Sequence, residues 1–214
     1  MEIQKNRIST TINDFCSVLE TEFDLISEER KERLLLLRDY INQKLIEKEV
    51  PQLIVICTHN SRRSHIGQLW LAVGADYFQL PTIQTFSGGT EATAFNTRAV
   101  NAFQRIGFQI AISGEITDNP IYQINWKEEG SPYEAFSKQY AAAPNPTENF
   151  GAIMVCSEAD VGCPIVLGCD FRLSLPYDDP KEFDETDLEE EKYDERVQQI
   201  GREILFLLSE VTPV

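Results

Sequence analysis

Apolar residues recur along the first fifty positions of this chain every three or four residues, which is the period of a helix. Two helices are therefore predicted before Pro51. Ser27 is a residue type that caps helix N-termini, and Glu28 and Glu29 after it suit the first turn of the second helix. The apolar positions are Ile8, Ile12, Phe15, Leu19 and Phe23 in the first helix and Leu34, Leu37, Ile41 and Leu45 in the second.

After Pro51 the pattern changes to short apolar runs that alternate with helical stretches. Such alternation is typical of a parallel sheet covered by helices on both faces. Asn96 is a candidate cap of one helix, Gly107 ends it, and Thr186-x-x-Glu189 reads as a capping box for the last helix. The predicted strands are residues 53–57, 83–86, 108–112 and 152–156, and the helix after the first strand is residues 64–75.

Residues 113–150 interrupt this alternation and are interpreted as an insertion near the rim of the sheet. Residues 121–126 alternate like an edge strand that pairs with residues 108–112 in a hairpin, and residues 132–140 are predicted as a short helix. The sequence thus predicts a three-layer α/β fold with a central, mostly parallel four-stranded sheet. We expect a helical extension over residues 1–50 and one catalytic domain over 51–214.

The chain of 214 residues has a net charge of −16, so a nucleic-acid backbone or an anionic membrane would repel it. No stretch reaches the apolar length of a membrane span, and the first residues lack the basic and apolar parts of a secretion signal. Five cysteines, an odd number, argue against a disulfide framework. We therefore expect a cytoplasmic protein whose cysteines are core residues, catalytic or redox-active; Cys16, within a helical pattern, is expected in the core.

The first strand ends on Cys57, and a short polar loop separates it from the helix that follows Arg63. Such a turn gathers backbone N–H groups into one concavity, and the helix N-terminus adds a positive dipole. A cysteine there is favoured as the thiolate, which is the nucleophilic form. Arg63 is a residue type that binds a tetrahedral oxyanion through two parallel hydrogen bonds. The alternative is a buried cysteine next to a solvated pair of arginines.

The spacing Cys-x5-Arg-Ser, with Asn60 inside it, resembles the phosphate loop of low-molecular-weight protein tyrosine phosphatases and of thioredoxin-coupled arsenate reductases. The resemblance implies that Cys57 is the nucleophile and that Ser64 hydrogen-bonds its thiolate. His59 stands where these families often have glycine. Arg62 stands where they have cysteine or an apolar residue; it is an extra anion ligand or, as we favour, a surface charge. The implied oxyanion-binding residues are Thr58, His59, Asn60, Ser61, Arg62 and Arg63.

A second pair of cysteines, Cys156 and Cys163, lies seven residues apart just after a predicted strand. The spacing does not fit a short zinc motif, no histidine is near in sequence, and we expect no metal. It suits thiol–disulfide exchange instead. Cys-x-x-Ala-Asp-x-x-Cys-Pro closely resembles the redox segment of thioredoxin-coupled arsenate reductases, which ordinary phosphatases of this class lack. The resemblance extends over about residues 51–112 and 150–210. Cys169 lies in a stretch interpreted as a loop and has no assigned role; it is a bystander or a substitute resolving thiol.

In both families an aspartate directly before proline, late in the chain, protonates the leaving oxygen. Asp179 matches that residue, with Asp178 as the alternative, although Asp-Asp-Pro is also an ordinary turn sequence. The resemblance then implies arsenate reduction. Cys57 attacks arsenate, Cys156 attacks Cys57 and releases arsenite, and Cys163 moves the disulfide to the 156–163 pair. No tightly bound cofactor is expected, and thioredoxin or a similar dithiol is the external reductant.

Two other functions remain open from the sequence. The same loop can hydrolyse phosphomonoesters through a cysteinyl-phosphate, although Lys181-Glu182-Phe183 after the Asp-Pro pair lacks the aromatic residues usual in tyrosine phosphatases. A non-enzymatic anion sensor or partner-binding protein is the third reading, and the intact set of Cys57, Arg63, Ser64 and Asp179 argues against it.

Overall fold

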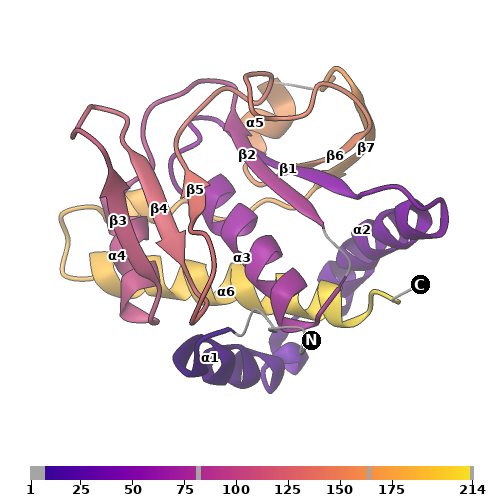
Figure 1. The fold of residues 1–214 in the computed structure, drawn as a ribbon, viewed down its shortest axis with the longest axis horizontal. Coiled ribbons are helices and arrows are strands. Elements are labelled where there is room, and N and C mark those ends of the chain that lie inside the picture. The colour runs from indigo at the N-terminus through magenta and orange to yellow at the C-terminus, as the bar shows by residue number, and fades with distance from the viewer. Residues whose placement is uncertain (1–7, 81–82, 163–164, 213–214) are drawn as a thin grey trace.

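The structure is a computed structural model, and it describes residues 8–80, 83–162 and 165–212. Two sheets and a set of helices form one body (Figure 1). The strands are β1 (Gln52–Cys57), β2 (Gln84–Gly89), β3 (Gln109–Ser113), β4 (Ile121–Asn125), β5 (Tyr133–Ala135), β6 (Phe150–Met154) and β7 (Cys169–Ser174). The helices are α1 (Thr10–Glu20), α2 (Glu28–Ile46), α3 (Arg63–Tyr77), α4 (Thr97–Arg105), α5 (Ser157–Gly162) and α6 (Glu189–Ser209), with short 3₁₀ turns at Phe23–Leu25 and Pro180–Phe183.

The main sheet has four parallel strands in the order β2-β1-β6-β7. Its central strand β1 is buried along almost its whole length, as expected for a parallel strand covered on both faces. The long helix α6 runs across the molecule behind α3 (Figure 1), and α2, α3 and α6 share one apolar core with β1 and β6. The predicted α/β class, a four-stranded parallel sheet flanked by helices, is confirmed.

The membership of that sheet differs from the prediction in one strand. Residues 108–112 were expected in the parallel sheet, but β3 pairs with β4 in an antiparallel hairpin, which was the alternative prediction. The fourth parallel strand is β7, whose sequence was interpreted as a loop. Asp170 and Arg172 hid the strand signal, and an edge strand tolerates such charged residues because one side of it faces solvent.

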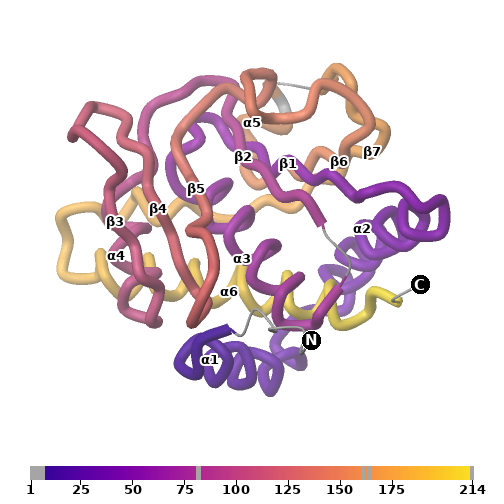
Figure 2. The backbone as a smooth tube through the Cα atoms, viewed as in Figure 1, coloured from indigo at the N-terminus to yellow at the C-terminus, as the bar shows by residue number. Residues whose placement is uncertain are grey.

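The chain between β3 and β6 forms a second, three-stranded sheet in the order β3-β4-β5. The helix predicted over residues 132–140 is wrong, because Tyr133–Ala135 pairs with β4. Tyr122 and Trp126 are buried and pack against other aromatic rings. Figure 2 shows the chain crossing from β5 toward the carboxyl end of β2, where Gln139 forms a bridge with Gly89.

Helices α1, α2 and α4 begin at capping residues that the sequence provides, whereas α6 does not. Ser9 and Ser27 cap α1 and α2, and Asn96 caps α4, each through its side-chain oxygen. The capping box predicted at Thr186 is wrong, because α6 begins only at Glu189, and the Glu189 carboxylate accepts from the backbone N–H of Glu185 instead. The segment before α6, residues 179–184, contacts Arg62 and Arg63 at the start of α3.

The two N-terminal helices pack directly on α6. The predicted inward faces are confirmed, since Ile12, Leu19, Leu34 and Ile41 are buried, and Cys16 lies in the core. The division of the chain at residue 50 stays a prediction. No helix in the part of the chain that the structure describes is both long and apolar enough to cross a membrane.

Candidate active site around Cys57

Cys57 lies at the carboxyl end of the central strand β1, between β2 on one side and β6 on the other. The chain connects β1 to β2 in one direction, and the later strands β6 and β7 extend the sheet in the other. This is the point in an open α/β sheet where strand order reverses and ligands bind. The predicted order of strand, loop and helix is confirmed, with α3 beginning at Arg63.

The sulfur of Cys57 is buried and lies 3.0 Å from the hydroxyl of Ser64. Asn60 Nδ2 donates to the same hydroxyl at 2.9 Å. Because Ser64 Oγ accepts from Asn60, its own proton is available for donation to the sulfur. A thiolate at Cys57 would thus receive a hydrogen bond from a hydroxyl that is already oriented.

Asn60 also fixes the loop backbone. It adopts a φ of 45°, the left-handed region that asparagine enters more readily than most residues. Its Oδ1 accepts from the backbone N–H of Lys138 at 2.8 Å. A single buried amide therefore ties the loop to Ser64 on α3 and to the chain that follows β5.

The carbonyl oxygens of the loop are held from outside by the chain after β2 and by Ser137. Thr58 O accepts from the N–H of Glu91 at 2.8 Å, and Ser61 O accepts from the N–H of Asn96 at 2.9 Å. His59 O accepts from the hydroxyls of Thr93 and Ser137. With the carbonyls turned outward, the intervening N–H groups turn to the concave side, as in an anion-binding nest.

Gly89 makes this packing possible. A Cβ at residue 89 would lie 2.1 Å from the carbonyl oxygen of Glu91, 2.6 Å from that of Thr58 and 2.7 Å from the backbone nitrogen of Asn60. The strand predicted to end at residue 86 is longer in the structure, because Ser87 to Gly89 complete strand β2. The glycine is needed there for close approach to the loop rather than for a turn.

Arg63 and Asp179 meet beside the loop. Arg63 donates to Asp179 Oδ2 at 2.6 Å and to the carbonyl oxygen of Tyr177 at 2.8 Å. Asp179 Oδ1 also accepts from the N–H of Lys181, which caps the 3₁₀ turn. Asp178 points away, with its side chain 96% exposed. Of the two candidate acids, the structure brings only Asp179 to the arginine of the loop.

Arg62 is not the surface charge that the sequence favoured, because its side chain is only 12% exposed. It donates to the hydroxyl of Tyr193 at 2.7 Å and to Asp184 Oδ2 at 3.3 Å. Both partners follow the loop by more than 120 residues. Nothing near Arg62 in the sequence could have indicated them.

Cys156 is buried at the end of β6, next to the anion loop. Its sulfur lies 3.4 Å from the hydroxyl of Thr58 and 3.4 Å from the backbone N–H of Ala159 in α5. Both Cys57 and Cys156 are free thiols. Cys163 lies outside the described residues. Among the residues that are described, no group of three or more His, Cys, Asp or Glu side chains is placed to hold a metal ion.

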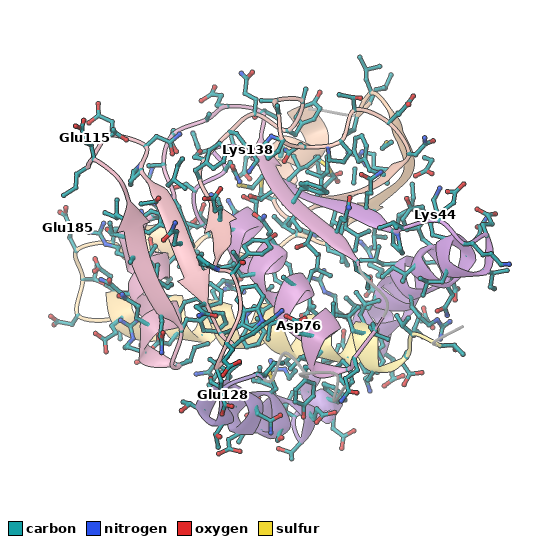
Figure 3. All side chains as sticks on the ribbon, viewed as in Figure 1. Lys44, Asp76, Glu115, Glu128, Lys138 and Glu185 are labelled. Carbon is teal, nitrogen blue, oxygen red and sulfur yellow. The ribbon has the colours of Figure 1, made fainter. Side chains whose placement is uncertain are left out.

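Two buried ionisable residues next to the loop were not singled out from the sequence. His65 stacks on Phe95 with ring centroids 4.2 Å apart, and burial lowers the pKa of His65 to about 3. Burial also lowers the pKa of Lys138 to about 8. Figure 3 labels Lys138 at the end of the molecule where α5 lies, far from Lys44 on α2. Neither was recognisable as buried before the fold was known.

Comparison with known proteins finds a similarity to arsenate reductases. No family model matches the chain. Two curated relatives from Staphylococcus epidermidis strains, named arsenate reductase 2 and arsenate reductase, are each 26% identical over 129 residues, which is 58% of this chain and 75% of the relative. Over these residues the chain is similar to the two arsenate reductases. This agrees with the family indicated by the Cys57 and Cys156 motifs.

Solved structures were also matched. A low-molecular-weight phosphotyrosine phosphatase from Vibrio cholerae aligns with a TM-score of 0.49 at 15% identity, over 74% of this chain and 95% of that one. A mutant of YwlE from Bacillus subtilis aligns with a TM-score of 0.47 at 13% identity, over 75% of this chain and 97% of that one.

Proposed function

We propose that this protein reduces arsenate to arsenite through a relay of Cys57, Cys156 and Cys163, recharged by a thioredoxin-like dithiol in the cytoplasm. The observation that carries the proposal is the contact between Cys156 Sγ and Thr58 Oγ1 at 3.4 Å, directly after the proposed nucleophile. A phosphatase has no use for a second thiol at that place. A reductase needs one within reach of the first sulfur.

The first step is displacement at arsenic. The oxyanion is bound by backbone N–H groups of the loop from Thr58 to Arg63. The Arg63 guanidinium gives up its contact with Asp179 and binds the oxyanion as well. The Cys57 thiolate forms an S–As bond, and one oxygen leaves as water after protonation by Asp179. Ser64 stabilises the thiolate before the attack, since its hydroxyl lies 3.0 Å from the sulfur.

The second step transfers the electrons. The Cys156 thiolate attacks the Cys57 sulfur, an S–S bond forms, and the pair of the S–As bond goes to arsenic, so As(V) leaves as arsenite. Cys163 then attacks Cys156 and releases the Cys57 thiolate, which moves the disulfide to the 156–163 pair. An external dithiol reduces that disulfide and is itself oxidised to a disulfide. No tightly bound cofactor takes part.

Phosphomonoester hydrolysis is the second candidate, and the contact between Arg63 and Asp179 favours it as a side activity. The same loop would form a cysteinyl-phosphate, with Asp179 acting first as acid and then as base. That chemistry requires Cys57 and Asp179 but neither Cys156 nor Cys163. The two functions therefore differ in which cysteines they need.

Two assays on wild type and Cys156→Ser decide between them. In wild type, we expect arsenate turnover with thioredoxin, its reductase and NADPH. In the variant, that turnover falls to background, while hydrolysis of 4-nitrophenyl phosphate stays within about twofold, because Cys156 takes no part in it. Strong phosphatase activity without arsenate turnover in wild type would refute the reductase proposal. Cys169→Ser, a change at a cysteine outside the proposed relay, is the matched control.

A further inference from the structure

Two adjacent arginines of the anion loop hold the two ends of one acidic segment, residues 179–184. Arg63 binds Asp179 at its start, with 2.6 Å between Nη2 and Oδ2. Arg62 binds Asp184 at its end, with 3.3 Å between Nη2 and Oδ2. The segment between them is the 3₁₀ turn Pro180–Phe183, which Asp179 itself caps. The segment that carries the proposed acid is thus attached to the loop that carries the nucleophile at two points.

The attachment at Asp184 is built around the buried Tyr193 and several partly buried charged groups. The Tyr193 hydroxyl, on a side chain fully buried in α6, accepts from Arg62 Nε at 2.7 Å and donates to Asp184 Oδ1 at 2.8 Å. Arg98 on α4 lies 3.7 Å from the same carboxylate and 2.7 Å from Glu189. Burial raises the pKa of Tyr193 to about 12, so this hydroxyl keeps its proton. Asp184 is therefore held by a network rather than by one exposed ion pair.

A bound oxyanion disrupts the contact between Arg63 and Asp179 but leaves the contact between Arg62 and Asp184 in place. An oxyanion in the loop competes with Asp179 for Arg63, because one guanidinium serves both. Arg62 is already committed to Tyr193 and Asp184, and its Nε lies 3.9 Å from Asp179 Oδ1. When Arg63 turns to the anion, the attachment through Arg62 remains, and a positive charge stays beside the freed carboxyl.

We propose that Arg62 is a positioning residue for the acid: it holds residues 179–184 against the anion loop, so that Asp179 stays within reach of a bound oxyanion after Arg63 has released it. Arg62 on this account is not a ligand of the oxyanion. The inference rests on the proposed function in that both use Asp179 as the acid. It applies equally to arsenate and to a phosphomonoester, because both need a proton on the leaving oxygen.

The test uses Arg62→Ala, Arg62→Lys and Tyr193→Phe, with Arg105→Ala as the matched control. Arg105 also pairs with a carboxylate of α6, Asp194, at 2.6 Å, but it does not contact residues 179–184. For Arg62→Ala we expect kcat on 4-nitrophenyl phosphate to fall about 10- to 100-fold, as misplacing a reacting group does, while KM stays within about threefold. The fall of kcat/KM at high pH, where a general acid loses its proton, should flatten in this variant. Arg62→Lys and Tyr193→Phe should give intermediate losses, and Arg105→Ala should match wild type.

A measurement that needs no turnover accompanies the kinetics. Hydrogen–deuterium exchange over residues 178–188, with and without saturating inorganic phosphate, should be faster in Arg62→Ala than in wild type, most clearly with phosphate bound. Phosphate should still protect Cys57 from alkylation by iodoacetamide in the variant. If wild type turns over neither substrate, the proposed function fails while the exchange data still decide the role of Arg62.

Two results would overturn the inference. A rise in KM with unchanged kcat, together with lost protection by phosphate, would make Arg62 an oxyanion ligand. Wild-type exchange and wild-type kcat in Arg62→Ala would leave it without a positioning role. If Arg62→Ala fails to fold, Tyr193→Phe still tests the inference, because it removes only one hydroxyl from the same network. Wild-type kcat and exchange in that variant would then refute the proposal.

Discussion

The two cysteine-bearing regions of this molecule are built very differently. Around Cys57, the loop is fixed from all sides: Asn60 bridges to Ser64 and Lys138, and the carbonyls of Thr58 and Ser61 are bound by the chain after β2. Around Cys156, the chain passes directly from β6 into the six-residue helix α5, and the sulfur has two contacts at 3.4 Å. The first region is fixed by hydrogen bonds along its loop. The second buries its sulfur beside a short helix, which Asp160 ties to Arg172 and Ser174 of β7.

This difference matches the two kinds of chemistry in the proposed relay. Binding and attacking an oxyanion gains most from groups that do not rearrange, because their orientation is fixed before the reaction begins. Passing a disulfide from one sulfur to the next requires a sulfur to move, since each exchange needs a new approach of the attacking thiolate. A loop fixed by many hydrogen bonds, next to a sulfur whose polar contacts are both 3.4 Å long, suits such a sequence of steps.

The largest expected effect comes from removing the sulfur of Cys57. Cys57→Ser should lower both arsenate turnover and 4-nitrophenyl phosphate hydrolysis by about 10⁴-fold or more, because both begin with this nucleophile. Cys16→Ala is the control: Cys16 is buried in the core, and burial raises the pKa of Cys16 to about 12, so it is not a nucleophile. Retained activity in Cys57→Ser would remove the loop from the mechanism.

The next largest effect is expected from removing Asp179, the proposed acid that contacts Arg63 of the loop. Asp179→Asn should lower both activities by about 10²- to 10³-fold, the usual loss when a general acid is removed. Asp178→Asn should change them less than about twofold, because that side chain is 96% exposed. Equal losses in the two variants would mean that the segment, rather than one carboxyl, matters. Measured kcat/KM values on both substrates decide.

The smallest expected effect concerns stability beneath the loop. Burial lowers the pKa of His65 to about 3, whereas an unfolded histidine titrates near 6.5. Below pH 6.5 the unfolded chain therefore binds a proton that the folded chain does not, and stability falls as the pH drops toward 3, by about 1.4 kcal/mol per pH unit. From pH 7 to pH 5 this amounts to a loss of about 2 kcal/mol.

Urea unfolding at pH 7 and pH 5 measures this effect. His65→Gln removes the titrating group, so its loss of unfolding free energy between the two pH values should be about 2 kcal/mol smaller than that of wild type. His59→Gln, a change at the half-exposed histidine of the loop, is the control and should keep the wild-type slope. Identical slopes in wild type and His65→Gln would contradict the burial of a neutral His65.

The same two regions show what the sequence could predict. The strand, loop and helix around Cys57 were predictable because every signal is local: an apolar run, a cysteine and an arginine six residues later. The family resemblance indicated Asp179 rather than Asp178 as the acid, and Asp179 is the residue of the two that contacts Arg63 in the structure. Their roles in catalysis stay predictions until the variants are measured.

The parts that the sequence missed depend on distant partners. Arg62 was assigned to the surface, because Tyr193 and Asp184 lie more than 120 residues away in the chain. Strand β7 was taken for a loop because its charged residues suit an edge position that only the finished sheet defines. The burial of Lys138 follows from the insertion folding onto Asn60, which no periodicity indicates.

The proposed relay is tested most directly by mapping its disulfide after one turnover. The reduced protein is mixed with arsenate without any external reductant, quenched in acid, alkylated and analysed by peptide mass spectrometry. The account predicts one arsenite per chain and a disulfide between Cys156 and Cys163 in wild type, and a disulfide between Cys57 and Cys156 in Cys163→Ser. Arsenite formed while all three cysteines remain alkylated, or no arsenite at all, would contradict it.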